Sequence, residues 1–330
     1  MDLIYADADR EDIGVLKDYK WDLAYGKDEN NFTCEVALQN NKCKEGFYLY
    51  MDGTEYGGIV DTVTVDTGSD TLTYSGRTWH GILESKIIQP DAGMDYLTLS
   101  GDAHTVLRTL INRLGLSDLF RVATGNSGIQ INYKMDRYIK AYTGIRKMLR
   151  ASGSKLKLSY DGAYAELSVV SATDYSADEQ FDTDQISFKV SKDYHPINHM
   201  ICLGTGELKD RMVVHLYTDA KGNISGTQTM TGLQEICETY DYANAESRED
   251  LIKGGTDKLQ EAWGKSTIDY DFEASAEAYD IGDIIGAVER NTGIAVRASI
   301  TKKIVTVSNG SVSIDYDSEA MTGTVDTSEC

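Results

Sequence analysis

Two histidines and a cysteine, His195, His199 and Cys202, lie close together in the sequence. Histidines four positions apart on a helix can share a zinc ion. Here Pro196 and the apolar run after His199 favour an extended chain, in which residues four apart lie about 13 Å from each other. Because that separation is too long for one metal ion, the pattern predicts no zinc site. It indicates instead the start of a strand, where Asn198 and His199 fix a turn.

Other segments begin like known sites without completing them. The run GTGE at positions 204–207 starts like a glycine-rich nucleotide loop, but a third glycine and a following Gly-Lys-Ser/Thr are missing, which favours a β-turn. Neither a G-x-S-x-G elbow nor an H-E-x-x-H zinc motif occurs. Asp315, Asp317 and Glu319 could attract Ca²⁺, but they lack the glycine and the spacing of an EF-hand loop. We therefore predict no catalytic residue, no cofactor and no bound metal.

The 330-residue chain carries a net charge of −21, so it repels phosphate and is a poor candidate for gripping a nucleic-acid backbone. Its length is sufficient for two domains, or for one domain with a large insertion. The start lacks a signal-peptide pattern, and no stretch approaches the ~20 apolar residues that span a bilayer. The cysteines are odd in number and widely spaced, which predicts free thiols, with a Cys34–Cys43 bridge as the alternative. They are Cys34, Cys43, Cys202, Cys237 and Cys330.

The first hundred residues have the pattern of strands. Apolar and β-branched residues recur at strand spacing, and Gly, Asp and Ser clusters separate the runs. The predicted strands are residues 47–51, 59–65, 71–74 and 78–88. This pattern is typical of an antiparallel sheet or a small barrel.

The apolar period then changes from 2 to 3.6, which predicts helices at residues 102–114 and 136–151. Ser100 or Asp102 can cap the first helix, and Gly115 can end it. A hairpin around Asp161-Gly162 should follow.

Strands are expected again at residues 199–204, 211–217 and within 281–316, where Asp280 and Asp283 have the character of turn residues. Helices are expected at residues 233–240 and 245–263, the second interrupted by Gly254-Gly255.

Five blocks in a fixed order carry a resemblance to a known family. They are GRTWHGILESKIIQP (76–90), SGDAHTVLRTLINRLGL (100–116), NHMICLGTGELKDR (198–211), VVHLYTDAKGNISGTQTMTGL (213–233) and YDIGDIIGAVERNTGIAV (279–296). In order and spacing they resemble siphophage and prophage tail-hub proteins, a structural family of tail-tip, baseplate-hub-like and tail-associated-lysin N-terminal-like chains. The blocks extend over nearly the whole chain.

The resemblance implies an α+β fold that is mainly β. Two β-barrel-like hub domains would comprise residues 1–100 and 171–330, with an α/β insertion domain at 101–170. The second hub domain would carry a further helical excursion around residues 231–264.

The resemblance also implies a structural role without catalysis. Such a protein forms a homotrimeric ring at the distal end of a phage or phage-derived tail, is made in the host bacterial cytoplasm, and ends up in the virion tail. Its implied partners are further copies of itself, the distal-tail ring protein, the tape-measure C-terminus, and tip or receptor-binding proteins. DNA would contact the protein only while passing through the channel. The negative charge would either keep DNA from binding to the channel wall or only solvate the protein surface. Alternatives are a tail-associated peptidoglycan hydrolase and a carbohydrate-binding tip module.

Basic side chains gather between residues 134 and 157, where eight Lys or Arg residues are opposed by Asp136 alone. They form either a solvated helix face or a dock for an acidic surface on a neighbouring chain, such as residues 231–264 with eight acids and three bases. Trp79 either packs in a core or anchors a subunit contact. The predicted interface residues are Trp79, Lys134, Arg137, Lys140, Arg146 and Lys147.

Overall fold

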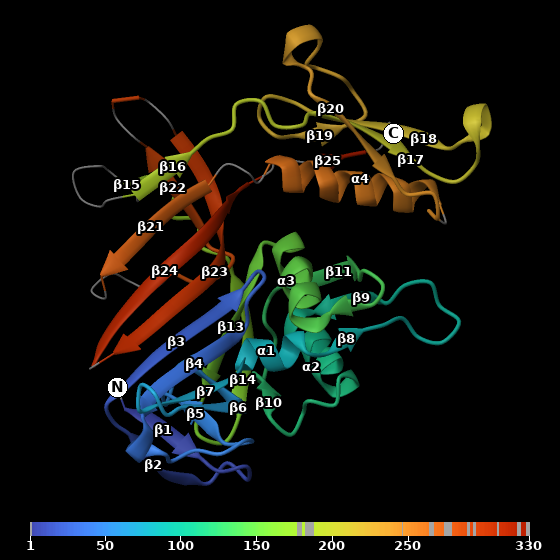
Figure 1. Cartoon of the computed structure of the whole chain (residues 1–330). Helices are drawn as coiled ribbons and strands as arrows, with labels where there is room; N and C mark the ends of the chain where they lie inside the picture. The colour runs from blue at the N-terminus through green and yellow to red at the C-terminus, as the bar shows by residue number, and fades with distance from the viewer. Residues whose placement is uncertain are drawn as a thin grey trace. The chain divides into compact units, whose positions relative to one another are not determined.

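The fold is mainly β, as predicted, with 42% of residues in strands and 19% in helices. It is known from a computed structural model (Figure 1). None of the sheets formed by the described residues closes into a barrel. Among the described helices, none has both the length and the apolar character needed to cross a membrane. The structure describes residues 2–176, 180–181, 188–245, 247–263, 267–273, 279–288, 291–292, 295–308, 310–321 and 325–327.

The chain divides into two compact units, each built from separate segments. Unit 1 comprises Met1–Asp174, Tyr270–Ile284 and Ile300–Asp317. Unit 2 comprises Tyr175–Asp269, Ile285–Ser299 and Ser318–Cys330.

Unit 1 is built on an antiparallel sheet in the order β21-β24-β23-β3-β4-β7-β6-β5-β1-β2. Alternate residues of neighbouring strands point into one core, as in the register pair Trp21 and Cys34 of β3 and β4. The strands predicted at 47–51, 59–65 and 71–74 are confirmed as β5, β6 and β7. The bounds are β1 (Leu3–Ala6), β2 (Asp12–Leu16), β3 (Tyr19–Gly26), β4 (Asn31–Ala37), the 3-10 helix η1 (Leu38–Asn40), β5 (Tyr48–Tyr50), β6 (Gly57–Asp66), β7 (Thr71–Thr78), β21 (Thr267–Glu273), β23 (Ala295–Ser308) and β24 (Ser311–Ala320).

The strand predicted at 78–88 is wrong, because β7 ends at Thr78 and a short helix, α1 (Trp79–Glu84), follows. The Gly81 N–H donates to the Thr78 Oγ1 at 3.2 Å and caps the helix. The glycine at position 81 also lets α1 lie close to the backbone at Asn30, because a Cβ there would lie 2.0 Å from the Asn30 carbonyl oxygen. Six residues are too few to display a 3.6-residue period, so the pattern could not reveal this helix.

The rest of unit 1 holds two longer helices and small sheets. α2 (Ala103–Arg113) confirms the prediction, with the Asp102 carboxylate accepting hydrogen bonds from the His104 and Thr105 N–H groups. α3 (Ala141–Ala151) begins five residues later than predicted, because β12 pairs with β8 just before it. The strands are β8 (Ile87–Ile88), β9 (Thr98–Asp102), β10 (Phe120–Val122), β11 (Gln130–Lys134), β12 (Ile139–Lys140), and the predicted hairpin of β13 (Ser154–Tyr160) and β14 (Ala165–Ser171).

Unit 2 contains a sheet in the order β20-β17-β18-β19-β25, and helix α4 packs along one face of it (Figure 1). Met200, Cys202 and Leu216 on that face join Leu251 and Leu259 of the helix in one core. The bounds are β17 (His199–Leu203), the 3-10 helix η2 (Leu208–Asp210), β18 (Val213–Thr218), β19 (Ile224–Ser225), the 3-10 helix η3 (Gly232–Gln234), β20 (Cys237–Asp241), α4 (Arg248–Trp263) and β25 (Val325–Asp326). The remaining strands of the chain are β15 (Gln180–Phe181), β16 (Phe188–Ser191) and β22 (Ile284–Val288).

The helix predicted at 245–263 is confirmed as α4, but the helix predicted at 233–240 is wrong. Residues 233–240 form the end of η3 and most of β20, which pairs in parallel with β17. α4 is also not interrupted at Gly254-Gly255, because those glycines allow close packing on the sheet. A Cβ on Gly255 would lie 2.2 Å from the Cys202 Sγ.

The cysteines Cys34, Cys43, Cys202 and Cys237 are free thiols, so the alternative of a Cys34–Cys43 bridge is wrong. Cys330 lies outside the described residues.

Candidate functional site

The predicted basic dock lies on and just before α3. The helix buries Tyr142, Ile145 and Met148, which leaves Lys147 and Arg150 exposed on its outer side. Burial of one helical stripe therefore forces the basic residues of the other stripe to the surface.

The exposed basic side chains already have contacts within unit 1. Lys147 Nζ lies 3.1 Å from the Asp136 carboxylate, and Lys140 Nζ lies 3.9 Å from Glu84. The Lys134 ammonium lies 3.6 Å from the centroid of the Tyr96 ring, and the Arg137 guanidinium is stacked over Tyr138 at 5.7 Å. Contacts of this kind at a surface are individually weak.

Arg146 and Trp79 differ from the other predicted interface residues because they point inward. Arg146 is half-buried and donates to the Thr301 carbonyl at 3.2 Å. Trp79 is fully buried, and its ring stacks on Tyr160 at 4.4 Å. A Cβ at Gly57 would lie 2.6 Å from the Trp79 Nε1, so the indole is enclosed on that side as well. Lys134, Arg137, Lys140 and Lys147 are therefore exposed on unit 1, whereas Arg146 is half-buried and Trp79 lies in the core.

Lys155, also from the basic segment, lies in a buried ion cluster of unit 1. Its Nζ donates to Asp280 at 2.6 Å and to both carboxylate oxygens of Asp283 at 2.7 Å. Asp283 accepts further hydrogen bonds from the Thr173 and Asp280 N–H groups. Burial by itself lowers the pKa of Lys155, but the hydrogen bonds that it donates to the two carboxylates, with their negative charges, outweigh burial and raise that pKa. Asp280 and Asp283 thus bind the start of β13 through Lys155, in addition to shaping a turn.

A cluster of different chemistry occupies the outer face of the unit 2 sheet. His199 on β17 is the register partner of Cys237 on β20 and of Tyr217 on β18. Register partners share a face, and residues two positions along a strand share it too, so His215 also lies there. The opposite face carries Cys202 and packs against α4.

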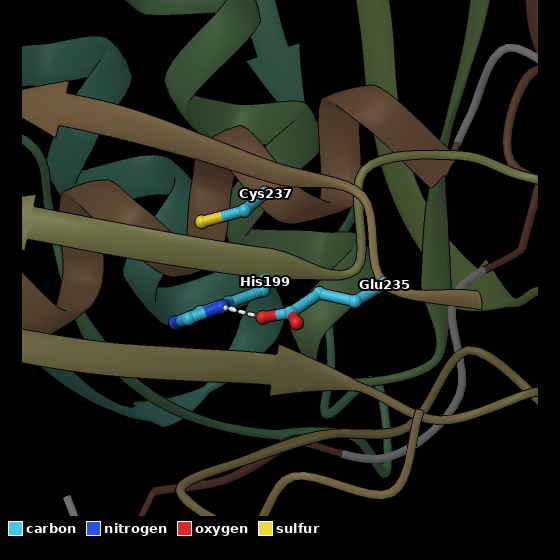
Figure 2. Close-up of side chains that lie close together, drawn as sticks. All are labelled: His199, Glu235 and Cys237. Carbon is cyan, nitrogen blue, oxygen red and sulfur yellow. Dashed lines mark hydrogen bonds and ion pairs between the residues drawn. The ribbon is translucent and has the colours of Figure 1, made fainter. Parts of the chain in front are cut away.

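The His199 ring makes a hydrogen bond at each nitrogen. Its Nδ1 lies 2.5 Å from a Glu235 carboxylate oxygen, and its Nε2 lies 2.8 Å from the His215 Nδ1. Figure 2 shows Glu235 reaching the His199 ring along this hydrogen bond, with Cys237 on the neighbouring strand. One donor atom from each of His199, Glu235 and Cys237 can be chosen so that all lie within 4.8 Å of one another.

Asn198 holds the Glu235 segment against β17. Its buried amide donates to the Gln234 carbonyl at 2.7 Å and accepts from the Ile236 N–H at 3.0 Å. These bonds bracket Glu235 on both sides and fix its backbone beside the His199 ring. Asn198, predicted to fix a turn, thus contacts the segment that leads into the neighbouring strand β20.

The surroundings change the acidity of two side chains in this cluster. Partial burial and the neighbouring His199 lower the pKa of His215. Partial burial and then Glu235 raise the pKa of the Cys237 thiol. An imidazole, a carboxylate and a thiol lie together on this face, and a thiol binds a cation once it has lost its proton.

The spacing of His195, His199 and Cys202 does not describe this cluster. His195 is exposed in the loop before β17, and Cys202 lies three positions beyond His199, on the opposite face. His215, Glu235 and Cys237 come from distant sequence positions, and only the pairing of β17 with β18 and β20 brings them together. The sequence does show which residues share a face, because side chains two positions apart on a strand point the same way. This identifies the cluster only when the pairing register of the strands is known.

No protein-family model and no curated protein matches the chain. Solved structures match over nearly its whole length. The prophage MuSo2 43 kDa tail protein from Shewanella oneidensis has a TM-score of 0.60 at 11% identity, covering 96% of this chain and 98% of that one. The chain has the fold of prophage tail proteins.

Two further structures agree with this fold assignment. The prophage tail protein gp18 from Listeria monocytogenes has a TM-score of 0.53 at 12% identity, covering 96% of this chain and 94% of that one. The tail protein from Neisseria meningitidis has a TM-score of 0.54 at 10% identity and covers 96% of both chains. The prophage tail fold therefore extends through both units, and it confirms the resemblance given by the five sequence blocks.

Proposed function

We propose that this chain is a structural component of a phage or phage-derived tail. The observation that carries the proposal is the prophage tail fold over 96% of the chain, shared with proteins from three bacteria. Because one fold can host unrelated functions, the proposal is an analogy at the level of the fold, supported by a match that covers nearly all of both chains.

More specifically, we propose that the chain is a hub protein at the distal end of the tail. Three copies form a ring that connects the tail tube to the tip and frames the DNA channel, with no reaction performed. The distal-tail ring protein, the tape-measure C-terminus, and tip or receptor-binding proteins are its partners. Residues 1–100 and 171–330 serve as barrel-like hub domains around the insertion at 101–170.

The basic side chains at α3 support a contact between copies. Lys134, Arg137, Lys140 and Lys147 are exposed in a chain whose net charge is −21. Exposed acids lie along residues 231–264, including Glu238, Asp257 and Glu261. Opposite charges on two surfaces of one chain favour head-to-tail association, which closes into a ring when the rotation allows.

The oligomeric mass of the purified full chain tests the ring. Native mass spectrometry and sedimentation velocity at low salt should show a trimer, and its dissociation should increase with salt because the contact is ionic. A monomer at all concentrations would overturn the ring. Zymography on cell walls and a glycan array, run on the same sample, should be negative; lysis or sugar binding would favour the hydrolase or the carbohydrate-binding alternative.

Charge reversal tests the surface. The triple variant Arg137→Glu, Lys140→Glu, Lys147→Glu should remain folded and lose the trimer. The matched control reverses three exposed lysines elsewhere, Lys17→Glu, Lys42→Glu and Lys44→Glu, and should assemble normally.

A charge swap makes this test more specific. Adding Glu238→Lys, Asp257→Lys and Glu261→Lys to the first triple should restore assembly. Normal assembly of the first triple alone would remove this surface from the proposal and leave the hub itself standing.

A further inference from the structure

The outer face of the unit 2 sheet presents three donor types that metal ions bind. His199 supplies an imidazole, Glu235 a carboxylate and Cys237 a thiol, with the donor atoms within 4.8 Å of one another. The His199 side chain is only 10% exposed, that of Glu235 is 31% exposed, and Cys237 is exposed. The cluster is therefore anchored at its imidazole and open to solvent at its thiol.

We propose that His199, Glu235 and Cys237 bind a Zn²⁺ ion on this face. Zinc takes nitrogen at about 2.0–2.1 Å, oxygen at about 2.0–2.2 Å and sulfur at about 2.3 Å, usually in a tetrahedron. Ligands in such a tetrahedron lie about 3.5 Å apart. The His199 Nδ1 and the Glu235 carboxylate oxygen, now 2.5 Å apart, must therefore separate by about 1 Å, while the Cys237 thiol, within 4.8 Å, must approach by about 1 Å. Rotation of the exposed Cys237 side chain can supply that approach. Three protein ligands leave a fourth position, which water fills.

The donor set favours zinc over the common hard cations. Mg²⁺ and Ca²⁺ prefer sites made of oxygen, with six or more ligands for Ca²⁺. A site with one thiolate, one imidazole and one carboxylate suits a borderline ion such as Zn²⁺. On binding, the Cys237 thiol releases its proton to solvent, and the His199 nitrogen that faces Glu235 must be free of its proton.

The neighbours of the cluster prepare it for a metal. When Nδ1 of His199 binds the ion, its Nε2–H can donate to the His215 Nδ1, which lies 2.8 Å away. That bond selects the tautomer and fixes the ring, as outer hydrogen-bond partners do in metal sites. His215 is therefore a positioning residue, and Asn198 has the same effect on the backbone of Glu235.

Bound zinc would fasten the segment before β20 to β17. Glu235 and Cys237 lie on either side of Ile236, where the chain leaves η3 and enters the sheet. This inference rests on the local geometry of unit 2 and is independent of the proposed tail function.

Metal titration of the full chain tests the proposal. Metal-free protein titrated with Zn²⁺ should bind one equivalent tightly. With Co²⁺ as a spectroscopic probe, the complex should show visible bands of a tetrahedral ion and a near-ultraviolet thiolate-to-cobalt band. Carboxylates elsewhere on this acidic surface cannot produce the thiolate band, so it separates the site from non-specific binding.

Single variants assign the ligands. Cys237→Ser should abolish the thiolate band, and Glu235→Gln and His199→Ala should each weaken Zn²⁺ binding by about 100-fold or more, beyond the loss of an outer partner. The matched controls His195→Ala and Glu238→Gln alter exposed residues of the same types nearby and should bind as the unmodified chain. Circular dichroism of the metal-free variants checks folding, and the exposed Cys237→Ser change remains informative if His199→Ala fails to fold.

His215→Ala should weaken Zn²⁺ binding by about 10- to 100-fold while keeping the thiolate band, and His215→Gln should recover part of the loss. The proposal is overturned if the unmodified chain shows no thiolate band, if the band persists in Cys237→Ser, or if the controls lose binding equally.

Discussion

His80 in unit 1 and His199 in unit 2 are both buried, but they have different partners. In unit 1, His80 is 4% exposed, stacks on Tyr25 at 4.3 Å and lies beside Tyr142. Burial, with smaller effects from nearby charges, lowers its pKa to about 4. In unit 2, His199 lies on an outer sheet face, with hydrogen bonds at both ring nitrogens and a thiol nearby.

The difference shows that the surrounding fold determines whether a polar side chain contributes to stability or is available to bind a ligand. Unit 1 buries polar side chains in its interior, as where Lys303, 2% exposed, donates to Glu55 at 2.6 Å. Burial tends to lower the pKa of Lys303, but Glu55, with smaller effects from Tyr56 and Tyr316, outweighs burial and raises that pKa. Unit 2 covers one sheet face with α4 and leaves donors available on the other. If this contrast holds, unit 1 substitutions should cost stability and outer-face unit 2 substitutions should cost binding.

The largest expected effect is from Lys155→Met. It leaves the buried carboxylates of Asp283 and Asp280 without their cation, which should lower the free energy of unfolding by about 3–5 kcal/mol. Urea denaturation, followed by the fluorescence of Trp21 and Trp79 in unit 1, measures it. The control Lys157→Met removes a half-exposed partner of the same Asp280, 3.4 Å away, and should cost less than about 1 kcal/mol. Equal losses in the two variants would contradict a buried cluster.

Acid should weaken unit 1 through His80. The folded pKa of about 4 lies below the ordinary value of 6.5, so the unfolded chain binds the extra proton first. Stability is fully present above pH 6.5 and is lost as the pH falls towards 4, by about 3 kcal/mol in total. Glu55 opposes this pKa shift, while Lys303 and Arg146 add to it.

The matched variant His80→Phe keeps an aromatic ring and removes the titration. The difference in unfolding free energy between it and the unmodified chain should therefore change over this pH range. A constant difference between pH 7 and pH 4 would show that His80 is not held neutral.

The inner face of the unit 2 sheet should tolerate bulk poorly. Gly255→Ala places a methyl group 2.2 Å from the Cys202 Sγ and 2.8 Å from the Leu216 Cδ1. Overpacking costs about 1–3 kcal/mol and Ala recovers up to about 1 kcal/mol of helix propensity, so a net loss of about 1–2 kcal/mol is expected. Thermal unfolding followed at Trp263 reports it. Adding Cys202→Ala should recover part of the loss, and strict additivity of the two changes would argue against this contact.

The smallest effect on stability is expected from the outer face. His215→Ala in metal-free protein should change the free energy of unfolding by no more than about 0.5 kcal/mol, because the side chain is exposed. The same denaturation curve at Trp263 measures it. A loss as large as that of Gly255→Ala would mean that the outer face belongs to the core, and the contrast between the two units would fail.

Local sequence patterns were sufficient to locate the helices and turns whose formation depends on residues close together in the chain. The 3.6-residue period and the Asp102 cap located α2 to within a residue at each end. The turn at Asp161-Gly162 located its hairpin because its signal lies within a few residues. Charge counting also found the basic segment around α3, since one amphipathic helix decides which of its residues are exposed.

Tertiary structure decided the rest. Gly254-Gly255 resembles a helix break until the sheet beneath α4 shows why no side chain fits there. His199, His215, Glu235 and Cys237 form a cluster only because β17 pairs with both β18 and β20. Periodicity and caps act within a few residues, so the sequence by itself determined a mainly β chain with its principal helices. Register and packing depend on the whole fold, and they decided which polar groups meet, which face is covered and where a metal could bind.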